Sequence, residues 1–176
     1  MAQRATVDIA GKIRAIPDFP KEGILFRDIT PLLLDAEALR YSVDKLADFA
    51  QSKEAELIIG AESRGFILGA AMAYKLGIGF APARKPGKLP WKTISADYAL
   101  EYGTDSLEMH EDAIRPGMRV LVHDDLLATG GTARAKCELV ERLGGVVVGL
   151  AFIVELVDLR GRDKLGGYDI LSLVQY

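Results

Sequence analysis

Cysteine is almost absent from this chain, because Cys137 is the only one among 176 residues. A single cysteine excludes an intrachain disulfide, and its place on an apolar helical stripe predicts a buried thiol with a structural role. There is no excess of one charge either: 22 basic and 25 acidic residues give a formal net charge of −3, which offers no general attraction to nucleic acid. Long hydrophobic runs are also missing, since stretches such as residues 146–154 fall short of the about 20 residues that a membrane-spanning helix needs. We therefore expect a soluble protein of a reducing, cytoplasmic compartment, with no nucleic-acid or membrane partner and one domain over residues 1–176.

Strand-like and helix-like segments alternate through most of the sequence. We expect strands at 57–61, 78–84, 120–123 and 146–155, and helices at 66–76 and 131–143, after an earlier helix capped by Asp35. This order predicts an α/β fold, a mainly parallel twisted sheet with helices on both faces, in which ligands bind beyond the carboxyl ends of the strands. A short helix at about 6–15, an irregular proline-punctuated segment after it, and an exposed β-hairpin between residues 93 and 110 complete the expected order.

Residues 120–132, VLVHDDLLATGGT, join a buried strand to a helix through two carboxylates and a turn of small residues. The turn, Thr129 to Thr132, offers unobstructed N–H groups, glycines that tolerate positive φ, two hydroxyls and a helix N-terminus, which together suit a phosphate monoester. Asp124 and Asp125 can accept hydrogen bonds from the vicinal hydroxyls of a ribose. Taken alone, a glycine pair is more often a plain connection, and an acidic pair is also found as a helix cap or a metal site. The pattern is neither a Walker loop nor the dinucleotide fingerprint.

The combined pattern closely resembles the signature of the type I phosphoribosyltransferases, which bind 5-phosphoribosyl-1-pyrophosphate. The resemblance covers nearly the whole chain and implies the fold of that family. It also implies that the acidic pair and the following turn bind the ribose and its 5-phosphate. The residues implied are Asp124, Asp125, Leu126, Ala128, Thr129, Gly130, Gly131 and Thr132. His123 departs from the family pattern, in which an aliphatic residue is usual, and we expect its side chain to pack away from the ligand.

Two further segments reach the same edge of the sheet. Arg64, in E-S-R-G-F, stands at a helix start, where the helix dipole disfavours a cation unless an anion or a solvated salt bridge compensates. A cationic loop follows the next strand, and such loops are more often simply solvated. Both segments resemble pyrophosphate-binding loops of the adenine-specific members of the family, in which a cis peptide bond between the equivalents of Glu62 and Ser63 is typical. The pyrophosphate-binding residues implied are Glu62, Ser63, Arg64, Arg84, Lys85, Lys88 and Tyr102.

The hairpin and the N-terminal segment, read by themselves, are an exposed turn and a packed arm. Resemblance to the same adenine-specific enzymes gives both a role. The hairpin, about 86–110, becomes a flexible lid over the site, and the N-terminal hood, about 1–34 together with the C-terminal segment, holds adenine. The adenine-binding residues implied are Leu25, Phe26, Arg27 and Leu156. The catalytic residues implied are Glu101, near the purine N7, together with Arg64 and Lys88.

The resemblance implies transfer of the 5-phosphoribosyl group from phosphoribosyl pyrophosphate to adenine, giving AMP and pyrophosphate. Mg²⁺ is the cofactor implied, carried mainly by the substrate's pyrophosphate without a dedicated protein site, and the enzyme is expected to be a homodimer. One alternative is an enzyme for a 6-oxopurine base, but those enzymes generally have a lysine and an aromatic near the last long strand, and residues 154–157 supply neither. The other is a non-catalytic sensor of the sugar phosphate. The lack of spare length or a basic stripe and the presence of Glu101 disfavour it.

Overall fold

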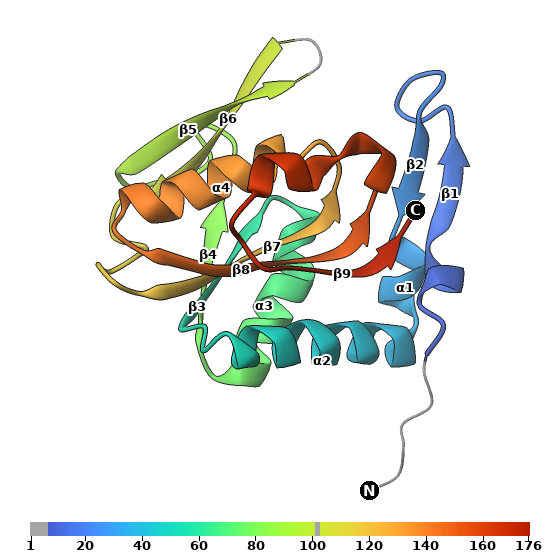
Figure 1. Ribbon diagram of the computed structural model, residues 1–176, viewed down its shortest axis with the longest axis horizontal. Helices are drawn as coiled ribbons and strands as arrows, with labels where there is room; N and C mark the ends of the chain where they lie inside the picture. Colours follow the sequence, from blue (N-terminus) through green and yellow to red (C-terminus); the bar gives the residue numbers. More distant parts are fainter. Residues whose placement is uncertain (1–6, 101–102) are drawn as a thin grey trace, which may run out of the picture.

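The computed structural model describes residues 7–100 and 103–176, and a five-stranded parallel sheet lies at its centre (Figure 1). The strand order is β4-β3-β7-β8-β9, and every neighbouring pair is parallel. Their bounds are β3 (Leu57–Ala61), β4 (Gly79–Ala83), β7 (Arg119–Leu127), β8 (Val146–Glu155) and β9 (Ile170–Gln175). Helices α2 (Ala36–Ser52) and α3 (Arg64–Leu76) cover one face, and α4 (Gly131–Arg142) covers the other. The predicted α/β class with a mainly parallel sheet is confirmed.

Each face of the sheet has its own apolar core. Beneath α2 and α3, buried side chains such as Leu46, Leu68 and Met72 pack on Ile58 and Leu121 of the sheet. Asp35 caps α2 as predicted, because its carboxylate accepts hydrogen bonds from the backbone N–H groups of the first helical turn.

The second core, beneath α4, includes the base of the hairpin formed by β5 (Thr93–Leu100) and β6 (Gly103–His110). Ala96, Leu107 and Met109 are buried there, so the prediction of an exposed hairpin is wrong for its lower half. The physical reason is the alternation of side chains along a strand, which turns Leu107 and Met109 to the same face, toward α4. The upper part of the hairpin projects away from the sheet (Figure 1).

The N-terminal segment forms a small hairpin beside the sheet. The helix predicted at 6–15 is wrong over its described part, where a single 3₁₀ turn, η1 (Ala10–Lys12), is followed by β1 (Arg14–Pro17). Gly11 weakens the helix, and β1 instead pairs antiparallel with β2 (Leu25–Asp28), which is followed by the short helix α1 (Thr30–Leu34). The segment expected to be irregular therefore contains a strand and a helix.

The C-terminal part adds elements that the sequence pattern did not predict. After β8 come the 3₁₀ helices η2 (Val157–Leu159) and η3 (Gly161–Leu165), and then the edge strand β9. Strand β7 is also longer than predicted, and continues through both carboxylates to Leu127. Within the described residues, no helix is long and apolar enough to cross a membrane.

Candidate active site

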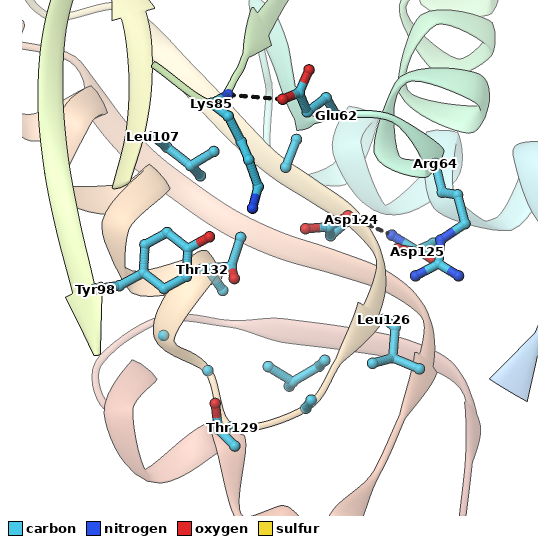
Figure 2. A pocket seen from close by; sticks show the side chains of 16 residues that line it. Glu62, Arg64, Lys85, Tyr98, Leu107, Asp124, Asp125, Leu126, Thr129 and Thr132 are labelled. Carbon is cyan, nitrogen blue, oxygen red and sulfur yellow. Dashed lines mark hydrogen bonds and ion pairs between the residues drawn. The ribbon is translucent and has the colours of Figure 1, made fainter. Parts of the chain in front are cut away.

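The turn from β7 to α4 forms the floor of a pocket of about 260 Å³, just below the usual range for small-molecule sites (Figure 2). Gly130 is the N-cap of α4 and has φ +80°, in the left-handed region that favours glycine. A Cβ atom on Gly130 would lie 2.4 Å from the carbonyl oxygen of Gly161 in η3, so the close approach of the two backbones also requires glycine. The turn thus presents backbone N–H groups and the N-terminus of α4 to the pocket, an arrangement that favours an anion.

The two adjacent carboxylates have different partners. Asp124 forms an ion pair with Lys136 of α4, with 2.8 Å between the nitrogen and the carboxylate oxygen. Asp125 pairs with Arg64 at the start of α3, with 2.7 Å between the nitrogen and the carboxylate oxygen. Figure 2 shows these two side chains next to each other. Burial, together with the negative charge of Asp124, raises the pKa of Asp125 well above its usual range. Both carboxylates line the pocket, where their oxygens can accept hydrogen bonds from hydroxyl groups.

His123 precedes this pair on β7 and is fully buried. Its Nδ1 lies 2.9 Å from the carbonyl oxygen of Ala151, and burial lowers its pKa to about 4. The histidine is absent from the pocket lining, in agreement with the expectation that it packs away from the ligand.

Cationic groups come to the pocket from the ends of the two neighbouring strands. The peptide bond between Glu62 and Ser63 is cis, as expected, and lies between β3 and α3. Glu62 accepts hydrogen bonds from the Arg84 side chain and the Lys85 backbone N–H, and these bonds hold its pKa below the usual value although burial acts in the opposite direction. The Lys85 side chain instead points into the middle of the pocket (Figure 2). It pairs there with Asp105 of β6, at 2.6 Å.

The N-terminal hairpin of β1 and β2 contacts Arg64, a residue that lines the pocket. The guanidinium of Arg64 lies over the ring of Phe26 in β2, 5.0 Å from its centre, and Phe26 also contacts Phe19 edge-to-face. Arg27 stacks on Tyr176, the last residue of the sequence, at 3.7 Å, whereas Leu25 is exposed. Leu156 follows β8, and its backbone N–H donates to the carbonyl oxygen of Leu127, beside the pocket floor.

The structure brings together most, but not all, of the residues that the sequence indicates. The predicted residues that line the pocket are Glu62, Arg64, Lys85, Asp124, Asp125, Leu126, Ala128, Thr129, Gly130, Gly131 and Thr132. Those absent from the lining are Ser63, Arg84, Lys88 and the four adenine-binding candidates Leu25, Phe26, Arg27 and Leu156. Glu101 and Tyr102 lie outside the described residues.

Sequence reasoning missed several residues at or behind this pocket, of which three are polar or come from the hairpin. Tyr98 of β5 and Leu107 of β6 line it, and Lys136 supports Asp124 from behind. Tyr98 and Leu107 come from the hairpin, so only its packing on α4 places them there. The sequence pattern does indicate that Lys136 is unusual. It occupies a position on the apolar stripe of α4, where a lysine is rare unless it is paired.

A parallel sheet with this acidic pair and glycine turn defines a phosphoribosyltransferase, and the family model described as "Phosphoribosyl transferase domain" matches residues 33–171. Adenine phosphoribosyltransferase of Clostridium perfringens is 58% identical over 170 residues, which are 97% of this chain and 99% of that relative. The crystal structure of adenine phosphoribosyltransferase from Thermoanaerobacter pseudethanolicus has a TM-score of 0.93 at 56% identity, covering 96% of this chain and 98% of that one. The Saccharomyces cerevisiae enzyme, complexed with an imino-altritol bisphosphate and adenine, has a TM-score of 0.88 at 38% identity, covering 94% and 96%. The chain belongs to the adenine phosphoribosyltransferase family.

This membership confirms the expected activity. The chain is a pentosyltransferase of purine salvage that transfers a phosphoribosyl group to adenine. The comparisons support neither the enzyme for a 6-oxopurine base nor the non-catalytic sensor.

Proposed function

We propose that the β7–α4 turn binds the 5-phosphate, that Asp124 and Asp125 bind the ribose hydroxyls, and that Arg64 and Lys85 bind the pyrophosphate. One observation carries this proposal: a single pocket unites a carboxylate pair, a phosphate-binding turn and two cationic side chains from neighbouring strand ends. The carboxylates suit hydroxyl donors, while the cations and the helix N-terminus suit phosphates. Glu62 supports the pyrophosphate loop by holding Arg84 and the Lys85 backbone, and Ser63, Lys88 and Tyr102 complete the proposed pyrophosphate contacts.

In the proposed reaction, the bond from C1′ to the pyrophosphate oxygen breaks ahead of the new bond, and its electron pair leaves with pyrophosphate. Arg64, Lys85 and Lys88 stabilise the charge that develops on the leaving group. Purine N9 then donates its lone pair to C1′ from the opposite face, while the proton on N7 passes to Glu101. Positioning and electrostatics supply most of the acceleration, and the hairpin keeps water from the electron-deficient ribose.

Mg²⁺ is proposed to arrive with the substrate, bound to pyrophosphate oxygens. Substrate phosphates are the usual ligands of this ion in transferase sites. The carboxylates of the pocket fit this arrangement, since Glu62, Asp124 and Asp125 each already have a cationic side chain as partner. When bound, the ion supplies charge neutralisation to the pyrophosphate.

Adenine is proposed to bind beneath the hood, which consists of residues 1–34 and the C-terminal segment. Leu25, Phe26 and Arg27 would contact the base from one side and Leu156 from the other. Support comes from the contact between Arg64 and Phe26, which joins the hood to the pocket, and from the stacking of Arg27 on Tyr176. The lid, about 86–110, would close on the opposite side.

The enzyme is further proposed to be a cytoplasmic homodimer. Ile67 and Tyr74, both exposed and two turns apart on α3, offer an apolar surface that a second copy would cover. Sedimentation equilibrium of the purified protein tests the dimer, and a monomer at micromolar concentration would contradict it. Cell fractionation tests the compartment, and recovery of the enzyme with membranes would contradict the proposal.

The activity is tested with purified protein, Mg²⁺ and phosphoribosyl pyrophosphate, offered adenine, hypoxanthine, guanine and xanthine separately. We expect AMP from adenine and little nucleotide from the other three bases. The residue assignments are tested in the same assay with Asp124 and Asp125 both changed to Asn. Normal turnover of that variant at low phosphoribosyl pyrophosphate would contradict the ribose assignment.

A further inference from the structure

Helix α4 carries a lysine that has no exposed surface. The Lys136 side chain is 0% exposed, and its ammonium group donates to the carbonyl oxygen of His123 and to Oδ2 of Asp124, both at 2.8 Å. An ammonium group removed from water is costly unless an anion and further acceptors compensate for the loss of hydration. An apolar side chain at this position would avoid that cost, so the lysine calls for an explanation beyond packing.

The partner of this lysine is fixed on its other side as well. Oδ1 of Asp124 accepts a hydrogen bond from the backbone N–H of Asp125, at 3.0 Å. The backbone of α3 lies close to the same carboxylate at Gly65. A Cβ atom added to Gly65 would lie only 2.9 Å from Oδ1 of Asp124. The Asp124 carboxylate is therefore held at both oxygens. Its side chain is 13% exposed, and Asp124 lines the pocket.

Asp125 is held quite differently. Its cationic partner, Arg64, is 40% exposed and stands at the pocket, where the pyrophosphate can compete for it. Two neighbouring carboxylates repel each other, and the negative charge of Asp124 contributes to the raised pKa of Asp125. Lys136, in contrast, is fully buried, so its pairing with Asp124 is shielded from solvent.

We propose that Lys136 is a positioning residue for the ribose: its buried ammonium pairs with the Asp124 carboxylate and holds it in one orientation, ready to accept a hydrogen bond from a ribose hydroxyl. This inference rests on the proposed assignment of Asp124 to the ribose. A lysine that served only the fold would stabilise the protein through its hydrogen bond to the carbonyl of His123. Its loss would leave the affinity for the sugar phosphate unchanged.

The first test is Lys136→Met, which keeps the length of the side chain and removes its charge. We expect the KM for phosphoribosyl pyrophosphate to rise by about tenfold to a hundredfold, as when an outer-shell partner of a binding residue is lost. The KM for adenine should stay within about twofold. The matched control is Lys75→Met, because Lys75 also pairs with an aspartate, Asp44, but lies in the last turn of α3, away from the pocket. The control should behave as wild type.

The second test is a double-mutant cycle with Asp124→Asn. If Lys136 acts through Asp124, the variant with both changes should bind phosphoribosyl pyrophosphate no more weakly than Asp124→Asn alone. Effects that multiply would overturn the proposal. If Lys136→Met alone does not fold, the comparison between Asp124→Asn and the double variant decides, because neither of these contains the negative charge of Asp124 without its cationic partner.

The outcomes separate the inference from the proposed function. An unchanged KM in Lys136→Met beside an active wild type overturns the inference alone. An inactive wild type would instead contradict the proposed function. If Lys136→Met and its combination with Asp124→Asn both fail to fold, Lys136 is assigned to the fold and the inference is likewise overturned.

Discussion

Gly130 shows at the scale of one residue how the β7–α4 turn, proposed to bind the 5-phosphate, depends on backbone shape. Its positive φ and its approach to the Gly161 carbonyl are separate constraints, and both exclude a side chain. Gly117, in the loop before β7, has φ +78°, but a Cβ atom added there would meet no other atom within 4 Å. Gly117 therefore shares only the first constraint.

This contrast predicts different outcomes for two identical substitutions. Gly117→Ala should lower the free energy of unfolding by about 1–2 kcal/mol, the cost of a left-handed alanine, and leave activity unchanged. Gly130→Ala should cost more and also raise the KM for phosphoribosyl pyrophosphate, because the turn must move away from Gly161. Urea denaturation and initial rates measure the two effects. Equal destabilisation with equal KM values would show that the approach to Gly161 is unimportant.

Much of the pocket could be predicted from local sequence, and the reason is topological. Carboxyl ends of parallel strands meet at one edge, so the loops after β3, β4 and β7 had to converge. What could not be predicted was the pairing within that edge. Asp124 and Lys136 are joined only when α4 packs on β7, and Asp125 meets Arg64 only when α3 packs beside it.

At the scale of elements, the hairpin of β5 and β6 is both a covering structure and a part of the core. Met109 is fully buried beneath α4, while Thr104, nearer the tip of β6, is exposed. A strand pattern predicts the hairpin, but only tertiary packing shows which half is buried. The same limitation explains the wrong N-terminal helix, because β1 is stabilised by pairing with β2 across residues 18–24, and local sequence does not reveal that pairing.

Because the lower half of the β5–β6 hairpin is buried, a substitution there should affect the stability of the whole protein. Met109→Ala should lower the free energy of unfolding by about 2–5 kcal/mol, through lost burial and the cavity left behind. Thr104→Ala, on the same strand, should change it by less than about 0.5 kcal/mol. Chemical denaturation followed by circular dichroism distinguishes them. A Met109→Ala protein as stable as wild type would mean that the hairpin contributes nothing to the core.

At the scale of the whole molecule, Glu155 joins three C-terminal elements. It ends β8, is buried, and accepts two hydrogen bonds from Arg162 of η3, at 2.6 and 2.7 Å, and one from Gln175 of β9, at 3.0 Å. The bonds from Arg162 are the main reason that its pKa is lowered to about 2, against the opposing effect of burial, with smaller contributions from Ser172 and Gln175.

This lowered pKa predicts how stability depends on acid. An acid with a depressed pKa in the folded state stabilises it above the unfolded pKa, near 4.5, and the stabilisation is lost as the pH falls toward 2. We expect the free energy of unfolding to fall by about 3 kcal/mol over this range because of Glu155. Glu155→Gln should flatten the dependence, which urea titrations at several pH values would measure. An unchanged slope would show that Glu155 does not contribute.

The strand order has a consequence for how the enzyme folds during its synthesis. β3 pairs with β7, so Leu57 lies beside Val120, and the chain between them must fold back before the pocket can close. Contacts so distant in sequence form late, because chain entropy opposes them until they are complete. The β7–α4 turn, proposed to bind the 5-phosphate, lies on the floor of the pocket. We therefore expect a nascent chain to gain affinity for the sugar phosphate only after α4 has left the ribosome and β7 has paired with β3.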